Sequence, residues 1–169
     1  KEGIARRIEQ AGMMRSLRQG GMTSSPEKGD IENIITILKG SFDEKEGGFG
    51  TGQKFPNPDA LDFLLSRYVK SNDKDLQKII TRTLGNMAKG DIYDRVEGGF
   101  FRYATKPDWS APHYEKMLEV NAGILKNYAE AYLVFKEAEY LHVLKKTIHY
   151  VRNNLFDKTS SVFFGSQNA

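Results

Sequence analysis

A short segment that begins with an aromatic residue and an aspartate occurs three times in this sequence, and it constrains the fold more than any other feature. The copies read FDEKEGGFG from residue 42, YDRVEGGFF from residue 93 and FDKTSSVFFG from residue 156. Their starts lie 51 and 63 residues apart, so each interval has room for two helices. Repeats of this length with one helix pair per unit are typical of helical hairpins stacked in a solenoid or closed into a toroid.

Each copy is expected to form a turn at a common rim. The Gly-Gly pair of the first two copies permits a tight turn, and the aromatic residues that follow favour a short strand. We therefore expect short strands near residues 98–103 and 162–165. The recurring aspartates Asp43, Asp94 and Asp157 indicate turn capping before catalysis, because an Asp side chain readily accepts hydrogen bonds from a following turn.

Between these turns, apolar residues follow the helical period. A helix is predicted over residues 2–19, followed by a linker that contains Ser, Pro and Gly. Further helices are predicted from Asp30, from about Asp59, from Asn72 or Asp73, from Ser110-Ala111-Pro112 to about Phe135, and from there to Leu155. The break near Phe135 is inferred partly because one helix of about 40 residues would be unusual in a globular domain.

This pattern divides the chain into two parts. We expect residues 1–29 to form a basic helix and linker, and residues 30–169 to form the hairpin repeats, an incomplete toroid. Residues 1–22 hold five basic and two acidic side chains, which accounts for the whole net charge of +3. The charges of the remaining residues balance, so the basic stripe that nucleic-acid binding requires is not expected.

The composition excludes several other classes. No apolar run approaches the length of a membrane span, and no signal-peptide pattern opens the chain. The absence of Cys excludes disulfides, thiol catalysis and thiolate metal sites within these residues. His142 and His149 lack the spacing of a zinc-binding helix, so neither a metal nor another cofactor is expected. These features lead us to expect a cytoplasmic protein.

The densest group of polar and aromatic residues lies between Asp94 and Asn121. Its aromatic rings offer flat faces of the kind that stack on sugars, and a His beside a carboxylate can transfer a proton. If a helix begins at Ser110, its N-terminus would favour anions near His113. The candidate catalytic residues are His113 and Glu115, and the candidate ligand-binding residues are Arg102, Tyr103, Trp109, Lys116 and Asn121. Each of these side chains also has a plausible structural role, such as packing by Trp109 or a backbone hydrogen bond by His113.

A second stretch, residues 47–58, combines glycines with Lys54. It lacks the Gly-x-x-x-x-Gly-Lys-Ser/Thr pattern of a phosphate-binding loop. We therefore expect it to be a turn at the end of a helical hairpin.

Several ordered motifs carry a family resemblance over roughly residues 30–169. The motifs are GGFG from residue 47, KFPNP from residue 54, MAKGDIYD from residue 87, GGFFRY from residue 98, PHYEKML from residue 112 and SQNA from residue 166. Together with Trp109 and Asn121-Ala122, they resemble the YyaL-like family, also known as the spermatogenesis-associated protein 20 family.

The resemblance implies a longer protein in which a thioredoxin-like domain precedes an (α/α) toroid. That toroid is similar to N-acylglucosamine 2-epimerases and six-hairpin glycosidases. We therefore expect an all-α fold, namely a partial (α/α) toroid of helical hairpins with short rim strands. The sequence departs from the family pattern at Phe101 where His is expected, at Glu119-Val120 where Tyr-Asp is expected, and at Asn168 where Asp is expected.

Two hypotheses for function remain open at this point. In the first, the toroid binds or modifies a carbohydrate, as epimerases and glycosidases do. In the second, the repeats form a non-catalytic interaction module that packs on a thioredoxin-like domain, which the departures at Phe101 and Val120 favour slightly. An incomplete toroid would leave apolar helix faces uncovered, so we also expect this chain to self-associate or to cover its open side with residues 2–19.

Overall fold

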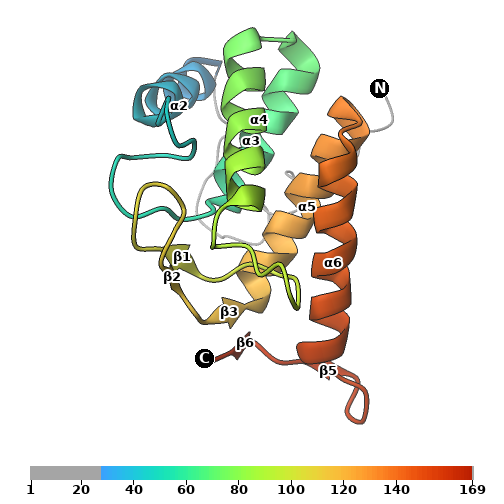
Figure 1. Ribbon diagram of the computed structural model, residues 1–169. Helices are drawn as coiled ribbons and strands as arrows, with labels where there is room; N and C mark the ends of the chain where they lie inside the picture. The colour runs from blue at the N-terminus through green and yellow to red at the C-terminus, as the bar shows by residue number, and fades with distance from the viewer. Residues whose placement is uncertain (1–27, 169) are drawn as a thin grey trace.

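The computed structural model describes residues 28–168, which form helical hairpins joined at one end by short strands and loops (Figure 1). The predicted helix at residues 2–19 lies outside the described residues. The helices are α2 (Lys28–Ser41), α3 (Pro58–Ser71), α4 (Lys74–Lys89), α5 (Leu118–Phe135) and α6 (Ala138–Asn154). The strands are β1 (Tyr103–Ala104), β2 (Pro112–His113), β3 (Lys116–Met117), β4 (Phe156–Asp157), β5 (Val162–Phe163) and β6 (Ser166–Gln167). The expected all-α architecture with short rim strands is confirmed.

The helix boundaries follow from local chemistry. Asp73 caps α4, because its side chain accepts hydrogen bonds from the N–H groups of Asp75 and Leu76. Lys136 ends α5 in the left-handed conformation, with φ at 62°. The break between α5 and α6 is therefore confirmed, although neither Gly nor Pro marks it.

The predicted helix start at Ser110-Ala111-Pro112 is wrong. Trp109 and Ala111 have φ values of 64° and 52°, which a right-handed helix cannot contain. The Ala111 carbonyl instead accepts hydrogen bonds from the N–H and the hydroxyl of Thr105, and this directs Pro112 into β2. Because α5 begins only at Leu118, the helix N-terminus expected to favour anions near His113 is not there.

The core lies between the two central helices, α3 and α5, and their neighbours α4 and α6. Leu61, Leu64 and Leu65 of α3 are fully buried, as are Ile124 and Tyr128 of α5. The Tyr128 hydroxyl donates a hydrogen bond of 2.7 Å to the Leu84 carbonyl and so joins α5 to α4. This packing places the loops that follow α2 and the loops and short strands that follow α4 and α6 along one common rim (Figure 1).

The three sequence repeats form three related turns at this rim, named here rim loop 1 (42–50), rim loop 2 (93–101) and rim loop 3 (156–164). An antiparallel pairing of two aromatic residues closes each loop. In the order of the loops, the pairs are Phe42 with Phe49, Tyr93 with Phe100, and Phe156 with Phe163.

The aspartate of each loop caps the turn, as expected. Oδ1 of Asp43 accepts hydrogen bonds from the N–H groups of Lys45 and Glu46, and Asp94 and Asp157 bind the backbone of their own loops in the same way. Burial acts to raise the pKa of Asp94, but hydrogen bonds from Lys116 and from the loop backbone outweigh it, so the pKa lies below its usual value.

Each of the first two rim loops packs on the second helix that follows it. A Cβ added to Gly47 would lie 3.0 Å from the Thr83 Cα on α4, and one added to Gly98 would lie 2.5 Å from the Lys146 carbonyl oxygen on α6. Both glycines have φ near +80°, with values of 71° and 87°. Only glycine meets both demands, which explains why these positions carry it.

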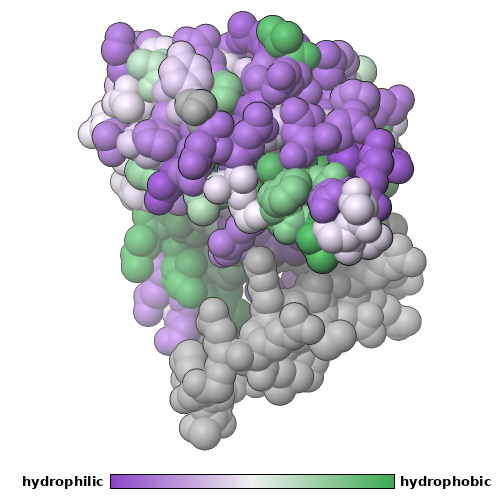
Figure 2. All heavy atoms as spheres, turned by 90° about the horizontal axis from the view of Figure 1, so that it is seen from below, coloured by the Kyte–Doolittle hydropathy of each residue, from purple (hydrophilic) through white to green (hydrophobic). Residues whose placement is uncertain are grey.

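The surface of the described residues is mixed in character. Figure 2 shows a mostly hydrophilic face with a few small hydrophobic clusters. No helix within residues 28–168 has the length and apolar character needed to cross a membrane.

Candidate functional site

The candidate site is a two-stranded ribbon at the rim. β1 and β2 pair antiparallel, with Tyr103 opposite His113 and Ala104 opposite Pro112. Directly opposed residues place their side chains on one face of the ribbon. The Tyr103 ring accordingly stacks on the His113 ring, with centroids 5.1 Å apart, and it also stacks on Phe55 at 5.0 Å.

This three-ring stack presents flat aromatic surface to solvent. Phe55 is 44% exposed, His113 is exposed and Tyr103 is half-buried. Nearby, the Tyr114 ring is 60% exposed and meets Phe101 edge to face, with centroids 5.2 Å apart. Exposed aromatic rings in this arrangement can bind an apolar ring face of a ligand, such as that of a sugar.

A charged pair flanks the ribbon, because Arg102 directly precedes β1 and Glu115 lies between β2 and β3. Nη1 of Arg102 lies 2.9 Å from Oε2 of Glu115, and the Arg102 N–H donates a hydrogen bond of 2.8 Å to the Glu115 carbonyl. The carboxylate is largely covered, whereas the guanidinium is about half exposed. Arg102 therefore retains donors that a hydroxylated or anionic ligand can bind.

Trp109, predicted to bind ligand, is part of the core. It is 1% exposed, and its Nε1 donates a hydrogen bond of 2.7 Å to the Glu46 carbonyl. Its ring and Cβ fill the space beside Gly48 and Gly90. The indole thus joins rim loop 1 to the segment before β2 and does not share the surface of Tyr103 and His113.

Lys116 and Asn121, also predicted to bind ligand, are buried and hold rim loop 2. Nζ of Lys116 binds the Asp94 carboxylate at 2.7 Å and the Gly98 carbonyl at 3.0 Å. The Asn121 amide accepts a hydrogen bond from the Phe100 N–H and donates one to the Phe100 carbonyl. Of the seven predicted site residues, the structure brings two pairs into contact, Tyr103 with His113 and Arg102 with Glu115.

The stretch at residues 47–58 forms a turn, as expected. Lys54 is fully buried, and its Nζ binds the Asp43 carboxylate at 2.8 Å and the Gly50 carbonyl. Its charge is therefore used within the fold and is not presented to a phosphate. The same stretch contributes Phe55 to the ring stack, and sequence reasoning missed this role because Phe55 lies 48 positions from Tyr103.

Sequence reasoning also missed a charged cluster between the two central helices. Nζ of Lys126 on α5 lies 2.6 Å from the Asp62 carboxylate on α3 and 3.8 Å from that of Glu130. Burial, followed by repulsion from Asp62, raises the pKa of Glu130 to about 7. The i, i+4 spacing of Lys126 and Glu130 indicated an ion pair in the sequence. Such a spacing by itself is typical of two solvent-exposed side chains on one helix, so it did not indicate a buried cluster.

The sequence is similar to several known proteins. Human spermatogenesis-associated protein 20 is 32% identical over 171 residues, which covers 98% of this chain and 22% of the human protein. The rat protein of the same name is 35% identical over 136 residues, covering 78% of this chain and 17% of its own length. An uncharacterized protein of Caenorhabditis elegans is 33% identical over 128 residues, covering 72% and 18%. This chain thus spans about a fifth of the length of these relatives.

No family model matches the sequence. The fold, however, is similar to solved sugar epimerases. Cellobiose 2-epimerase from Spirochaeta thermophila has a TM-score of 0.72 at 18% identity, covering 80% of this chain and 36% of that enzyme. A sugar epimerase from a ruminal bacterium scores 0.71 at 14% identity, covering 83% and 40%. At such low identity the likeness concerns the fold, and it confirms the expected epimerase-like toroid architecture.

Proposed function

Because this chain belongs to the family of spermatogenesis-associated protein 20, of whose length it spans about a fifth, we propose that it contributes a carbohydrate-binding rim to an (α/α) toroid. The ligand is a mono- or disaccharide. The fold that this chain shares with sugar epimerases supports the proposal but does not carry it, because one fold can host many functions.

The observation that carries the proposal is the stack of Phe55, Tyr103 and His113 beside the Arg102–Glu115 pair. Sugars present an apolar face of C–H groups and an edge of hydroxyls. An exposed ring face suits the first, and a guanidinium next to a carboxylate suits the second. The ring stack includes residues of the β1–β2 ribbon, and the charged pair lies on the segments that flank it.

Within this proposal, His113 and Glu115 are the groups that can transfer a proton. They stand two positions apart, with His113 at the end of β2 and Glu115 in the segment that joins β2 to β3. Arg102 holds the Glu115 carboxylate in place, and the Tyr103 ring fixes the plane of the imidazole. A bound sugar that reaches both groups can be deprotonated at one position and protonated at another, as general acid–base chemistry requires.

The test is a titration of the ¹⁵N-labelled chain with N-acetylglucosamine, N-acetylmannosamine and cellobiose, followed by NMR. We expect shifts confined to residues around Tyr103 and His113, and loss of those shifts in His113→Ala. Phe163→Ala is the matched control, because it removes an exposed rim aromatic outside the ribbon. Shifts that persist in His113→Ala, or no shift with any of these sugars, contradict the proposal.

A second function, a non-catalytic interaction module, is favoured by the position of Phe101. This residue stands where the family pattern expects His. Its ring packs against Tyr114, and the Lys116 ammonium lies 4.9 Å from its centroid. A ring in these contacts stabilises the ribbon and transfers no proton. Binding of a thioredoxin-like domain, with no shift from any of the sugars, would agree with this second function.

A further inference from the structure

The stretch over residues 112–117 carries both groups that can transfer a proton, His113 and Glu115, and two strands hold it. Its first part forms β2 and pairs with β1, whereas its last part forms β3 and pairs with β6. In the second pairing, Lys116 lies opposite Gln167. Glu115 stands between the two pairings, so its position depends on β1 and on β6.

The backbone around Glu115 is tied to both neighbours. The Arg102 N–H donates a hydrogen bond of 2.8 Å to the Glu115 carbonyl. The Leu118 N–H donates one of 2.8 Å to the carbonyl of Gly165, which directly precedes β6. Because peptide units are planar and leave two soft torsions per residue, a movement of β6 away from β3 reaches the nearby backbone of Glu115.

β6 is a weak element by itself. It has two residues, and both are exposed. A short ladder whose hydrogen bonds are open to solvent separates at a low free energy. A side chain tethers this strand, because the Tyr150 hydroxyl on α6 donates a hydrogen bond of 2.7 Å to Oε1 of Gln167. Since Tyr150 is fully buried, the bond attaches an exposed strand to the core.

Tyr150 also holds β3 and rim loop 2. Its ring centroid lies 4.1 Å from the Lys116 ammonium, and a Cβ added to Gly99 would lie 2.5 Å from its Cδ1. Burial, followed by the charges of Glu97 and Asp94, raises the pKa of Tyr150 to about 12, so the hydroxyl keeps its proton and donates at neutral pH. One ring thus fixes β3 through a lysine and β6 through a glutamine.

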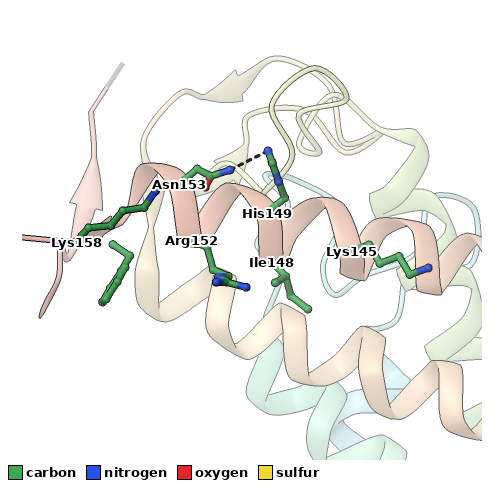
Figure 3. Close-up of a pocket in the computed structure, with 7 residues that line it drawn as sticks. Lys145, Ile148, His149, Arg152, Asn153 and Lys158 are labelled. Carbon is green, nitrogen blue, oxygen red and sulfur yellow. Dashed lines mark hydrogen bonds between the residues drawn. The ribbon is translucent and has the colours of Figure 1, made fainter. Parts of the chain in front are cut away.

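α6 carries a second side-chain hydrogen bond of similar length, which offers a control. His149 and Asn153 are both exposed, and Nδ2 of Asn153 lies 2.8 Å from Nε2 of His149. Figure 3 shows this pair on one side of the helix, whereas Ile148 and Arg152 project from another. These four residues line a pocket of about 560 Å³ that does not include Tyr150.

We propose that Tyr150 and Gln167 are positioning residues of the sugar site, which hold Glu115 against Arg102 by keeping β6 on β3. Their part in sugar binding rests on the proposed function, whereas the placement of Glu115 does not. When the bond between Tyr150 and Gln167 is lost, β6 separates from β3 more often. Glu115 then loses the constraint on its C-terminal side, and a sugar on the ring stack meets the carboxylate less well.

The first test needs no sugar and measures hydrogen exchange of single amides by NMR. Gln167→Met removes the acceptor and keeps a side chain of similar length, and Tyr150→Phe removes the donor and keeps the ring. Each variant is expected to speed exchange of the Leu118 and Arg102 amides about tenfold, because one hydrogen bond no longer opposes the opening of β6.

A role confined to overall stability would speed all protected amides alike. The Ala104 amide, which binds the Lys54 carbonyl on the other side of β1, is therefore expected to keep its rate. Gln167→Glu retains an acceptor and is expected to restore the parent's rates. Ser166→Ala, on the same strand, and Asn153→Ala, which removes the second bond on α6, are expected to change neither amide.

The second test repeats the sugar titration. The affinity of Gln167→Met is expected to be about fivefold below that of the parent, because a displaced Glu115 no longer meets the bound sugar in the productive geometry. Gln167→Glu is expected to recover it. An Arg102 amide that exchanges at the parent's rate in both Gln167→Met and Tyr150→Phe overturns the proposal, and so does an unchanged affinity where exchange is faster.

The two tests separate this proposal from the proposed function. A parent chain that binds none of the sugars contradicts the sugar site. Faster exchange of the Arg102 amide in Gln167→Met then still supports the placement of Glu115 by Gln167, and unchanged exchange overturns it.

Discussion

Nζ of Lys116 lies 2.7 Å from Oδ2 of Asp94, and the lysine is 4% exposed. The ammonium also lies 4.1 Å from the centroid of the Tyr150 ring. One side chain therefore connects rim loop 2, the strand before α5 and helix α6. Lys54 and Asp43 form the same pair one repeat earlier, so the two buried lysines are structural counterparts.

Lys116→Met is expected to destabilise the chain by about 3–5 kcal/mol, because it leaves the Asp94 carboxylate buried without its cation. Urea unfolding followed by circular dichroism measures the loss. Lys106→Met, at an exposed position, is the control and is expected to change little. Equal midpoints for the two variants would contradict a structural role for the buried pair.

Gly98→Ala is expected to cost about 2–4 kcal/mol, because the new Cβ meets the Lys146 carbonyl in a backbone conformation that L residues avoid. Gly52→Ala is the matched control, since a Cβ there meets nothing within 4 Å. Thermal unfolding of the two variants measures the difference. An unchanged melting temperature for Gly98→Ala would show that rim loop 2 is not packed on α6 as described.

Asn121→Ala is expected to cost about 2–4 kcal/mol, because it leaves the buried N–H and C=O of Phe100 without partners. Hydrogen exchange of the Phe100 amide measures the effect directly and is expected to accelerate. Ala122→Ser changes the adjacent exposed position and serves as the control. If the Phe100 amide keeps its protection in Asn121→Ala, the two hydrogen bonds between Asn121 and Phe100 are not what holds rim loop 2 in place.

Glu130 makes the stability depend on pH. Its pKa is raised to about 7 in the folded chain, first by burial and then by Asp62, so between about pH 4.5 and 7 the folded state binds more protons than the unfolded state. Stability is therefore expected to fall as the pH rises through this window, by up to about 3 kcal/mol at about 1.4 kcal/mol per pKa unit.

Glu130→Gln removes this titration, so the variant is expected to show a flatter pH profile and higher stability than the parent at pH 8. Denaturant unfolding at several pH values measures both effects. Glu119→Gln, at an exposed position of the same helix, should keep the profile of the parent. A parent chain whose stability is constant between pH 5 and 8 would exclude the raised pKa.

The repeat and the helical period predicted the helices well, because both follow from residues close together in the sequence. Asp73 illustrates this, since its capping role depends on the next three residues alone. The stretch around Ser110 failed for the opposite reason. Its turn conformation, with left-handed φ values at Trp109 and Ala111, depends on the hydrogen bonds between Thr105 and Ala111 and on the burial of Trp109 against Glu46, which lies 63 positions away.

The candidate site was predicted only in part, because its exposure, like the conformation around Ser110, depends on residues far away in the sequence. Residue types that suit a ligand also suit a packed rim, and the sequence pattern does not distinguish a half-buried Tyr103 from a buried Trp109. Burial separates them, and burial depends on the neighbouring repeat. The contribution of Phe55 was missed because the strand pairing of Lys54 with Ala104 brings two distant loops together.

The packing of rim loops 1 and 2 on the second helix that follows each of them also constrains the order in which the chain can fold. The Gly48 N–H binds the Thr83 hydroxyl, 35 positions further along, and Lys146 reaches the Val96 carbonyl across 50 positions. On a ribosome, which releases the N-terminus first, rim loop 1 cannot acquire these contacts until α4 has left the exit tunnel. Each of the first two rim loops therefore reaches its native packing only after the next helix pair has been synthesised.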